Sequence, residues 1–217
     1  MSNKLYLIIY RHNMHNCVCC HALCERNALF RKKNGRPFGG GGVGVVFFNM
    51  YYDMAALLLA LELSGQYRRK MSITAGKCDP HDNGCLFKTL CREIHEEIGL
   101  KITVDELMTM SCNPFTGQIT NLIINRTPVV ICFVRPGFSS KPLKKELEYR
   151  HANPSQYQHS FREIGDLQWI SLTGYVLKGQ LISPYSCDIL SDFAQKILEV
   201  LYSNQMKYIG IWNKKYH

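Results

Sequence analysis

The sequence lacks any uninterrupted apolar run near the ~18 residues that a membrane-spanning helix needs. It also has no internal repeat of the length that builds solenoids. A short apolar stretch covers residues 5–10, but no small-residue cleavage site follows it, so we read it as a strand rather than a signal peptide. These absences argue against the membrane and repeat classes. They predict an intracellular protein, cytoplasmic rather than secreted, with no membrane partner.

Acidic residues are scarce: Asp and Glu total 17 against 26 Lys and Arg, which gives a formal net charge of +9. Basic pairs and triplets recur along the chain, at Lys32-Lys33, Arg68-Arg69-Lys70, Lys144-Lys145 and Lys214-Lys215. A basic balance attracts polyanions and makes their binding depend on salt. The charge therefore predicts a polyphosphate or nucleic-acid partner. The alternative is that it serves only solubility.

The 217 residues suit one domain with an appendage, and a hydrophobic content of 46% is enough for a real core. The ten cysteines, without a secretion signal, predict mostly reduced thiols. Four of them cluster with histidines near the N-terminus, at positions 17, 19, 20 and 24. That cluster has enough sulfur for one zinc ion, but no second C-x2-C pair follows, so ordinary reduced cysteines are the favoured reading.

Residues 1–38 read as an N-terminal extension, which four glycines close, and residues 39–217 read as the main domain. Apolar runs predict strands at 43–49, 71–75, 101–112, 127–135 and 167–172. Residues 57–63 suit either a strand or a helix, and 136–160 is a long polar stretch of the kind that forms functional or mobile loops. Helices are expected at 85–98 and 183–203. This order predicts an α/β sandwich with a mixed sheet.

The most informative segment runs from Arg92 to Leu100, where Glu93, Glu96 and Glu97 stand at i, i+3 and i+4 before a glycine. On a helix these acids share one face, and each like-charge pair costs roughly 0.2–0.5 kcal/mol. They also lie near the negative end of the helix dipole. Helical spacing sets them at the rim of the apolar arc rather than on the fully solvated face. Carboxylate oxygens suit hard cations, so the segment predicts a site for Mg²⁺ or Mn²⁺.

This segment resembles the box of the Nudix hydrolase family, G-x5-E-x7-R-E-U-x-E-E-x-G-U with U aliphatic. The second half matches at every defined position, from Arg92 to Leu100. The first half departs, because Gly76 is followed after five residues by Asp82, and nine residues rather than seven then lead to Arg92. Counted back from Arg92, the Glu position holds Gly84. The partner of the box arginine is therefore either Asp82, through a longer loop, or missing.

The resemblance covers roughly residues 43–202 and implies a Nudix-type α/β/α sandwich with a mixed β-sheet, and a divalent-metal-dependent pyrophosphatase. It implies the following roles: Glu93, Glu96 and Glu97 hold the metal, Glu96 or Glu97 serves as base, and Arg92 organises the loop. Gly76 and Lys77 would let the backbone approach the metal-bound pyrophosphate. Glu163 is the candidate for an extra carboxylate from a later loop, in competition with Glu146 and Glu148.

The family cleaves a nucleoside diphosphate linked to another group, and the box does not name that group. The net charge of +9 and the aromatic residues favour capped mRNA, with release of m7GDP. Decapping enzymes of large DNA viruses similarly combine a Nudix core with an irregular N-terminal extension. The alternative is a small dinucleotide such as ADP-ribose, NADH or a coenzyme A derivative. A second alternative is a catalytically silent domain that binds nucleotide or RNA, supported by loss of the loop Glu.

Overall fold

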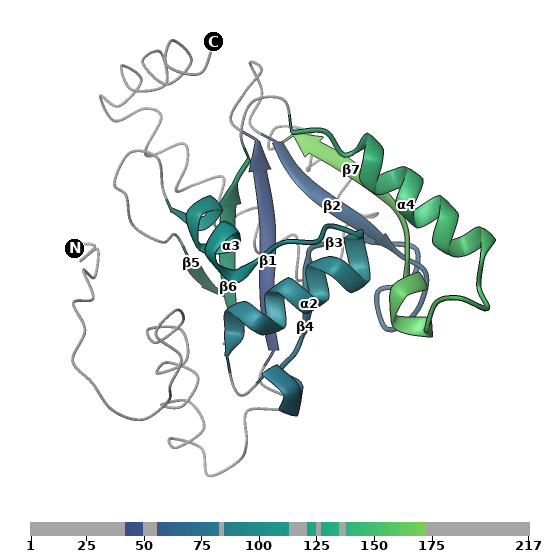
Figure 1. Ribbon diagram of the computed structural model, residues 1–217. Helices are drawn as coiled ribbons and strands as arrows, with labels where there is room; N and C mark the ends of the chain where they lie inside the picture. Colours follow the sequence, from purple (N-terminus) through teal and green to yellow (C-terminus); the bar gives the residue numbers. More distant parts are fainter. Residues whose placement is uncertain are drawn as a thin grey trace, which may run out of the picture.

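The computed structural model describes residues 42–49, 56–82, 85–112, 121–124, 127–134 and 138–171 (Figure 1). The N-terminal extension with its cysteine cluster, Gly84 and the expected helix at 183–203 lie outside the described residues. The domain boundary at residue 39 therefore stays a prediction. Within the described ranges, no helix combines the length and the apolar character needed to cross a bilayer.

Seven strands of the described chain form one mixed sheet. They are β1 (Gly42–Asn49), β2 (Ala56–Glu62), β3 (Met71–Ser72), β4 (Thr74–Lys77), β5 (Asn121–Ile124), β6 (Thr127–Phe133) and β7 (Ile164–Ser171). The main strand order is β3-β2-β1-β6-β5, while β4 pairs with β1 and β7 pairs with β2. The β1–β6 pair is parallel and every other described pair is antiparallel. The residues 57–63 that suited either state are thus mainly strand, as the hairpin partner of β1.

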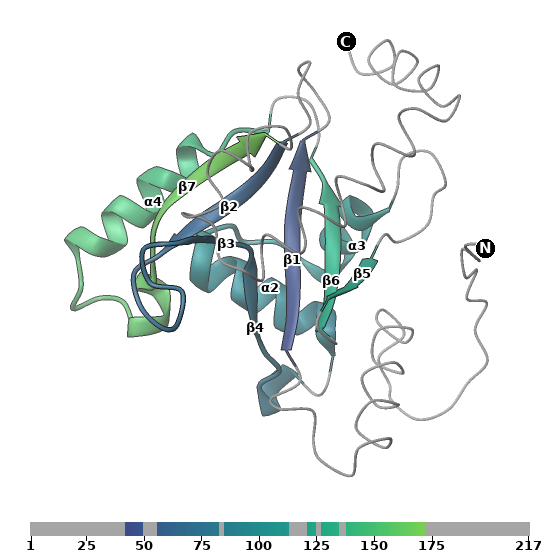
Figure 2. The same ribbon diagram turned by 180° about the vertical axis from the view of Figure 1, so that it is seen from behind.

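Three helices accompany the sheet: α2 (Leu86–Ile98), α3 (Val104–Ser111) and α4 (Lys141–Ala152). Two 3-10 turns, η1 (Pro80–Asp82) and η2 (His159–Arg162), precede α2 and β7 respectively. Figures 1 and 2, seen from opposite sides, show α2 and α3 on one face of the sheet and α4 beside β7. The apolar face of α2 packs in one core cluster with alternate residues of β1, such as Val43, Val45 and Phe47. Val46 and Ile131, from the intervening strand positions, are equally buried.

The strands expected at 43–49, 127–135 and 167–172 and the helix at 85–98 are confirmed over the described residues, although β6 ends at Phe133 and β7 begins earlier, at Ile164. The strand expected at 71–75 is divided between β3 and β4. The mixed sheet with covering helices confirms the predicted fold class.

The strand expected at 101–112 is wrong, because residues 104–111 form helix α3. Thr103 and Glu106 make a capping box: the Thr103 hydroxyl accepts from the Glu106 amide at 3.2 Å, and the Glu106 carboxylate accepts from the Thr103 amide at 2.8 Å. These bonds satisfy amide groups that a helix start leaves without partners. The capping box therefore favoured a helix in a segment whose apolar content suited either a helix or a strand.

The long polar stretch at 136–160 is not one loop, since α4 occupies its centre. A proline stands in the first turn of α4, where a missing amide costs nothing. Leu143, Leu147 and Arg150 are buried, which places them on one helical face. Only two of these three residues are apolar, so the hydrophobic pattern of this helix was too weak to identify it.

Candidate functional site

The box helix begins and ends at defined residues. At its start the Cys85 sulfur accepts from the Lys88 amide at 3.4 Å, and at its end Gly99 adopts the left-handed conformation with φ of 79°. A glycine pays no Cβ penalty there and closes the helix. Glu93, Glu96 and Glu97 thus occupy the last two turns of α2, beside strand β4.

Gly76, on β4, is the residue against which the Glu93 carboxylate lies. A Cβ atom added at Gly76 would collide with the Glu93 carboxyl group. Glu93 is only 8% exposed, and its pKa is raised because burial disfavours the charged form, an effect that Arg92 partly offsets. The glycine at position 76 is therefore the condition for bringing a carboxylate of α2 onto the strand.

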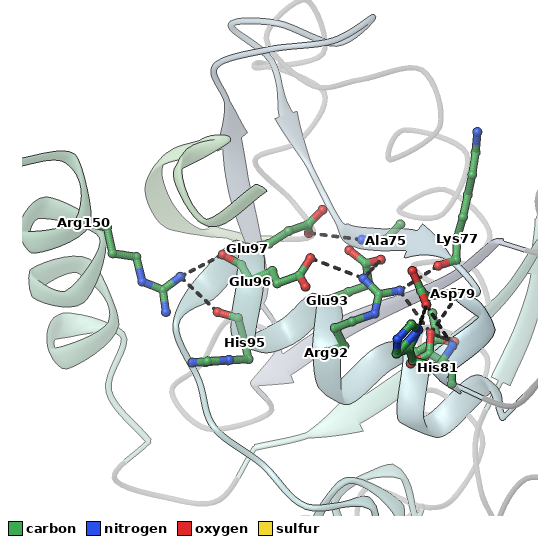
Figure 3. Close-up of polar contacts among 12 residues, drawn as sticks. Ala75, Lys77, Asp79, His81, Arg92, Glu93, His95, Glu96, Glu97 and Arg150 are labelled. Atoms are coloured by element: carbon green, nitrogen blue, oxygen red, sulfur yellow. Dashed lines mark hydrogen bonds and ion pairs between the residues drawn. The ribbon is translucent and has the colours of Figure 1, made fainter. Parts of the chain in front are cut away.

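Arg92 is the centre of the polar network (Figure 3). Its Nη1 lies 2.7 Å from Oε1 of Glu93 and 3.3 Å from Oε2 of Glu96. Its Nη2 donates to the Lys77 carbonyl oxygen at 2.8 Å and to Oδ2 of Asp82 at 3.1 Å. One guanidinium thus joins the end of β4, the η1 turn and the carboxylate face of α2.

Asp82 is the candidate partner of Arg92 that the Nudix pattern left undecided. Besides Arg92, its Oδ2 accepts from the Thr89 hydroxyl and from the Asp79 amide, each at 2.9 Å. Desolvation by itself would raise the pKa of Asp82, but the hydrogen bonds from Asp79, Arg92 and Thr89 hold that pKa below its ordinary value. The longer loop therefore still delivers a carboxylate to Arg92.

Glu97, the next residue after Glu96 on α2, lies against the backbone of β4. Its Oε2 accepts a hydrogen bond from the Ala75 amide at 3.2 Å. Burial raises the pKa of Glu97 well above its ordinary value, and the nearby carboxylates of Glu93, Glu62 and Glu163 raise it further. The Glu97 proton is thus bound more tightly than that of an exposed carboxyl.

Glu163 comes from a different part of the chain, just after η2. Its carbonyl oxygen accepts from the Leu63 amide at 2.7 Å, which fixes it at the end of β2. Its carboxylate lies 3.1 Å from Nδ1 of His159 and contributes to the raised pKa of both Glu97 and Glu62. The structure thus brings Glu163 into the electrostatic neighbourhood of the box glutamates.

The two competitors of Glu163 have other surroundings. Glu146 accepts from Nε of Arg150 at 2.9 Å, and Glu148 is exposed on α4. Sequence reasoning missed Glu62, whose pKa burial raises and whose carboxylate is coupled to Glu163 and Glu97. The only signal for it was one acid at the end of an otherwise apolar strand.

The donor chemistry of the site fits a hard divalent cation. Several carboxylates raise one another's pKa, and carboxylate oxygens are the ligands that Mg²⁺ and Mn²⁺ prefer. Within the described part of the chain, however, no three acidic, histidine or cysteine side chains are gathered as a ready metal cage. Arg92 binds Glu93 and Glu96 instead, so a cation would have to compete with that guanidinium.

Lys77 contributes its backbone rather than its side chain to this network. Its carbonyl oxygen accepts from Arg92, while its side chain extends away from the three glutamates (Figure 3). Gly76 and Lys77 both lie at the site. The contacts described for them are with Glu93 and Arg92 of α2.

No family model and no curated protein sequence matches the chain. Solved structures with a similar arrangement include the NUDIX domain of Shewanella oneidensis NrtR complexed with ADP ribose, at 14% identity and a TM-score of 0.44. The match covers 78% of this chain and 97% of that domain.

A second similar structure is a bifunctional NMN adenylyltransferase/ADP ribose pyrophosphatase from Francisella tularensis, complexed with AMP and a Mn ion. It matches at 13% identity and a TM-score of 0.45, over 81% of this chain and 46% of that one. The Nudix hydrolase RenU from M. smegmatis matches at 12% identity and a TM-score of 0.40, over 76% and 90%. Likenesses this distant assign no activity. The motif from Arg92 to Leu100, together with the sheet, loop and helix that hold it, identifies this chain as a domain of the Nudix fold.

Proposed function

We propose that this protein is a Nudix hydrolase that cleaves the diphosphate of a nucleoside diphosphate linked to another group, with Mg²⁺ or Mn²⁺ as cofactor. One observation carries the proposal: Arg92 ties Asp82 and the Lys77 carbonyl to helix α2, whose Glu93 and Glu97 lie against β4 and whose Glu96 pairs with Arg92. Arg92 offsets part of the repulsion among these acids, and a bound cation would offset the rest of this costly gathering of like charges at a helix end.

Each side chain has a role in the proposed reaction. Glu93, Glu96 and Glu97, with Glu163 from the later loop, would hold the cation, which when bound neutralises phosphate oxygens and lowers the pKa of a bound water. Gly76 keeps the strand free of a side chain where Glu93 approaches, and Gly76 and Lys77 would let the backbone approach the diphosphate. Arg92 keeps the loop against the helix.

The bond that forms joins the water oxygen to phosphorus, and the bond that breaks is the phosphorus–oxygen bond of the diphosphate bridge. The water proton must pass to a base, a role that Glu96 or Glu97 would take. Glu97 has the stronger support, because burial and the neighbouring carboxylates raise its pKa well above the ordinary value, and a raised pKa makes a carboxylate a better proton acceptor.

ADP-ribose and related small dinucleotides are the first substrate class to test. The Shewanella domain is complexed with ADP ribose, and the Francisella protein is an ADP ribose pyrophosphatase. Capped RNA is the second class, and its support is the net charge of +9 with the exposed basic residues Arg68, Arg69 and Lys145.

The silent-domain alternative rested on the missing loop Glu. The contact between Asp82 and Arg92 speaks against that argument, because the arginine has an acidic partner at 3.1 Å. Turnover of any diphosphate would exclude this alternative.

A substrate panel tests the proposal. The full chain would be incubated with ADP-ribose, NADH, a coenzyme A derivative or capped RNA, under Mg²⁺ and under Mn²⁺, and the products separated by chromatography and mass spectrometry. We expect release of a nucleoside monophosphate from a dinucleotide, and its loss in Glu97→Gln. The matched control is Glu148→Gln, an exposed acid on α4. Release of m7GDP at a faster rate would assign capped RNA instead, and no product with any substrate would contradict the proposal.

A further inference from the structure

Arg150 is the most deeply buried basic side chain of the described residues, at 1% exposure. It lies on α4, far in sequence from the carboxylate helix. A buried guanidinium is costly unless its donors find acceptors and its charge finds compensation. The groups that contact Arg150 therefore indicate its structural role.

The first of these groups is the end of α2. Nη1 of Arg150 donates to the carbonyl oxygens of His95 and Glu96, at 3.0 and 2.8 Å (Figure 3). Both carbonyls belong to the last turn of α2, where the helix dipole is negative, and the His95 carbonyl oxygen also accepts from the Gly99 amide at 3.2 Å. The two residues lie between Glu93 and Glu97, and Glu96 is itself one of the three acids. A cation from another helix thus caps the very turn that carries the site.

The second is the segment that leads to Glu163. The centre of the Arg150 guanidinium lies 5.1 Å from the ring of Phe161 and 5.6 Å from the ring of Tyr157. The Phe161 ring also meets the His95 ring edge-to-face, with centroids 5.3 Å apart. Cations are attracted to aromatic faces, and more strongly when desolvated. Arg150 therefore joins α4, the η2 segment and the end of α2 at one point.

Its remaining contact fixes the guanidinium itself. Nε donates to Oε1 of Glu146, one turn earlier on α4, at 2.9 Å. The side chain of Glu146 also lies against Gly99, where an added Cβ would meet its Cγ at 2.7 Å. The glycine that ends α2 thus leaves room for the carboxylate that orients Arg150.

We propose that Arg150 is a positioning residue, which holds the last turn of α2 and the η2 segment together so that Glu97 and Glu163 face the same site. The Glu163 carbonyl oxygen is bonded to Leu63 at the end of β2 and the Glu97 carboxylate to Ala75 of β4, so the two residues are anchored to different strands. Arg150 touches neither carboxylate. The inference rests on the proposed function, because it concerns how cation-binding groups are aligned.

Cation affinity measures this alignment directly. Binding of Mn²⁺ would be followed by the paramagnetic resonance signal of the free ion, in the wild type and in Arg150→Met and Arg150→Lys. We expect Arg150→Met to weaken Mn²⁺ binding by about 10–100-fold, the usual effect of losing a residue that orients metal ligands. Arg150→Lys should fall between, since an ammonium keeps the charge but cannot reproduce the fork of donors. kcat should fall by a larger factor than the factor by which KM changes.

The control is a variant that loses stability without any change at the site. Ile131→Ala removes a fully buried side chain on β6, on the sheet face opposite α2, so it should lower Tm and leave Mn²⁺ affinity unchanged well below that temperature. Should Arg150→Met fail to fold, Phe161→Leu removes one aromatic face and keeps the arginine; it should weaken Mn²⁺ binding to a smaller degree.

The outcomes separate the two ideas. A wild type that binds no Mn²⁺ and hydrolyses no diphosphate contradicts the proposed function. A wild type that binds Mn²⁺, with folded Arg150→Lys and Phe161→Leu variants of the same affinity, leaves the proposed function standing and overturns the positioning role.

Discussion

The Arg92 guanidinium lies 3.1 Å from the Asp82 carboxylate, across a loop two residues longer than the Nudix pattern provides. An aspartate is one methylene shorter than a glutamate, and the η1 turn carries it to the arginine. The pair shows how a changed spacing and a changed residue can preserve one contact.

Asp82→Asn should destabilise the protein by about 1.5–3 kcal/mol, because it removes the charge from a buried carboxylate bonded to Arg92. At about 2–4 °C per kcal/mol, thermal unfolding near neutral pH would show a clear fall in Tm. Asp82→Glu, which restores the residue type of the box, is the control. An unchanged Tm in Asp82→Asn would mean that the ion pair does not stabilise the loop.

The same carboxylate predicts a dependence on pH. The pKa of Asp82 is below its ordinary value of 3.8, so its ionised form stabilises the fold. That contribution is present above the ordinary value and is lost as the pH falls through the lower, folded value. The free energy of unfolding would be measured with denaturant between pH 2 and 6, roughly two units either side of the ordinary value of 3.8. Plotted against pH, the free energies of wild type and Asp82→Asn should converge at low pH. Parallel curves would contradict this assignment.

Glu97→Gln should stabilise the metal-free protein while it abolishes activity. The raised pKa of Glu97 means that its ionised form costs stability, and the cost develops as the pH rises above the ordinary value of 4.5. Relief of the i, i+4 repulsion with Glu93 alone is worth roughly 0.2–0.5 kcal/mol. Calorimetry at neutral pH would measure the rise in Tm. A clear fall in Tm would show that Glu97 is compensated in a way that these contacts do not include.

Gly76→Ala should displace the Glu93 carboxylate, because the added Cβ collides with it. Forced overpacking of this kind costs about 1–3 kcal/mol, and we expect weakened Mn²⁺ binding as well. Gly165→Ala is the matched control on β7, since its Cβ meets only the flexible end of Leu63, at 2.7 Å. Equal loss of Mn²⁺ affinity in both variants would argue against a specific role for Gly76.

Cys132 should resist alkylation in the folded protein. It is fully buried on β6, and burial raises the pKa of its thiol to about 12, so the reactive thiolate is scarce near pH 8. Mass spectrometry after iodoacetamide treatment, with and without urea, would show modification of Cys132 only in the unfolded sample. Labelling at native conditions at the rate of a free thiol would contradict the packing of β6.

The sequence was most informative where periodicity and a terminating residue agreed. In α2 the apolar positions recur at helical spacing and Gly99 ends the helix, so the placement of Glu93, Glu96 and Glu97 on one rim followed from geometry alone. In α3 the apolar residues were ambiguous, and the Thr103–Glu106 cap carried the decisive information.

The remaining parts of the site depend on tertiary contacts that no local pattern contains. Glu62 comes near Glu163 because β2 pairs with β7 in a register that places Glu62 opposite Ile164. Arg150 is buried by rings from a segment beyond its own helix. Polar residues of this kind read as surface until the pairing of distant elements is known.

The parallel pairing of β1 with β6 has a consequence for biosynthesis. Residues 44–48 align with residues 129–133, so the centre of the sheet cannot close until the whole carboxylate helix and everything up to β6 have left the ribosome. Closure over so long a separation is entropically slow. β1 can pair earlier with β2 and β4, but its edge toward β6 stays open until then, and an open apolar strand edge favours chaperone binding during translation.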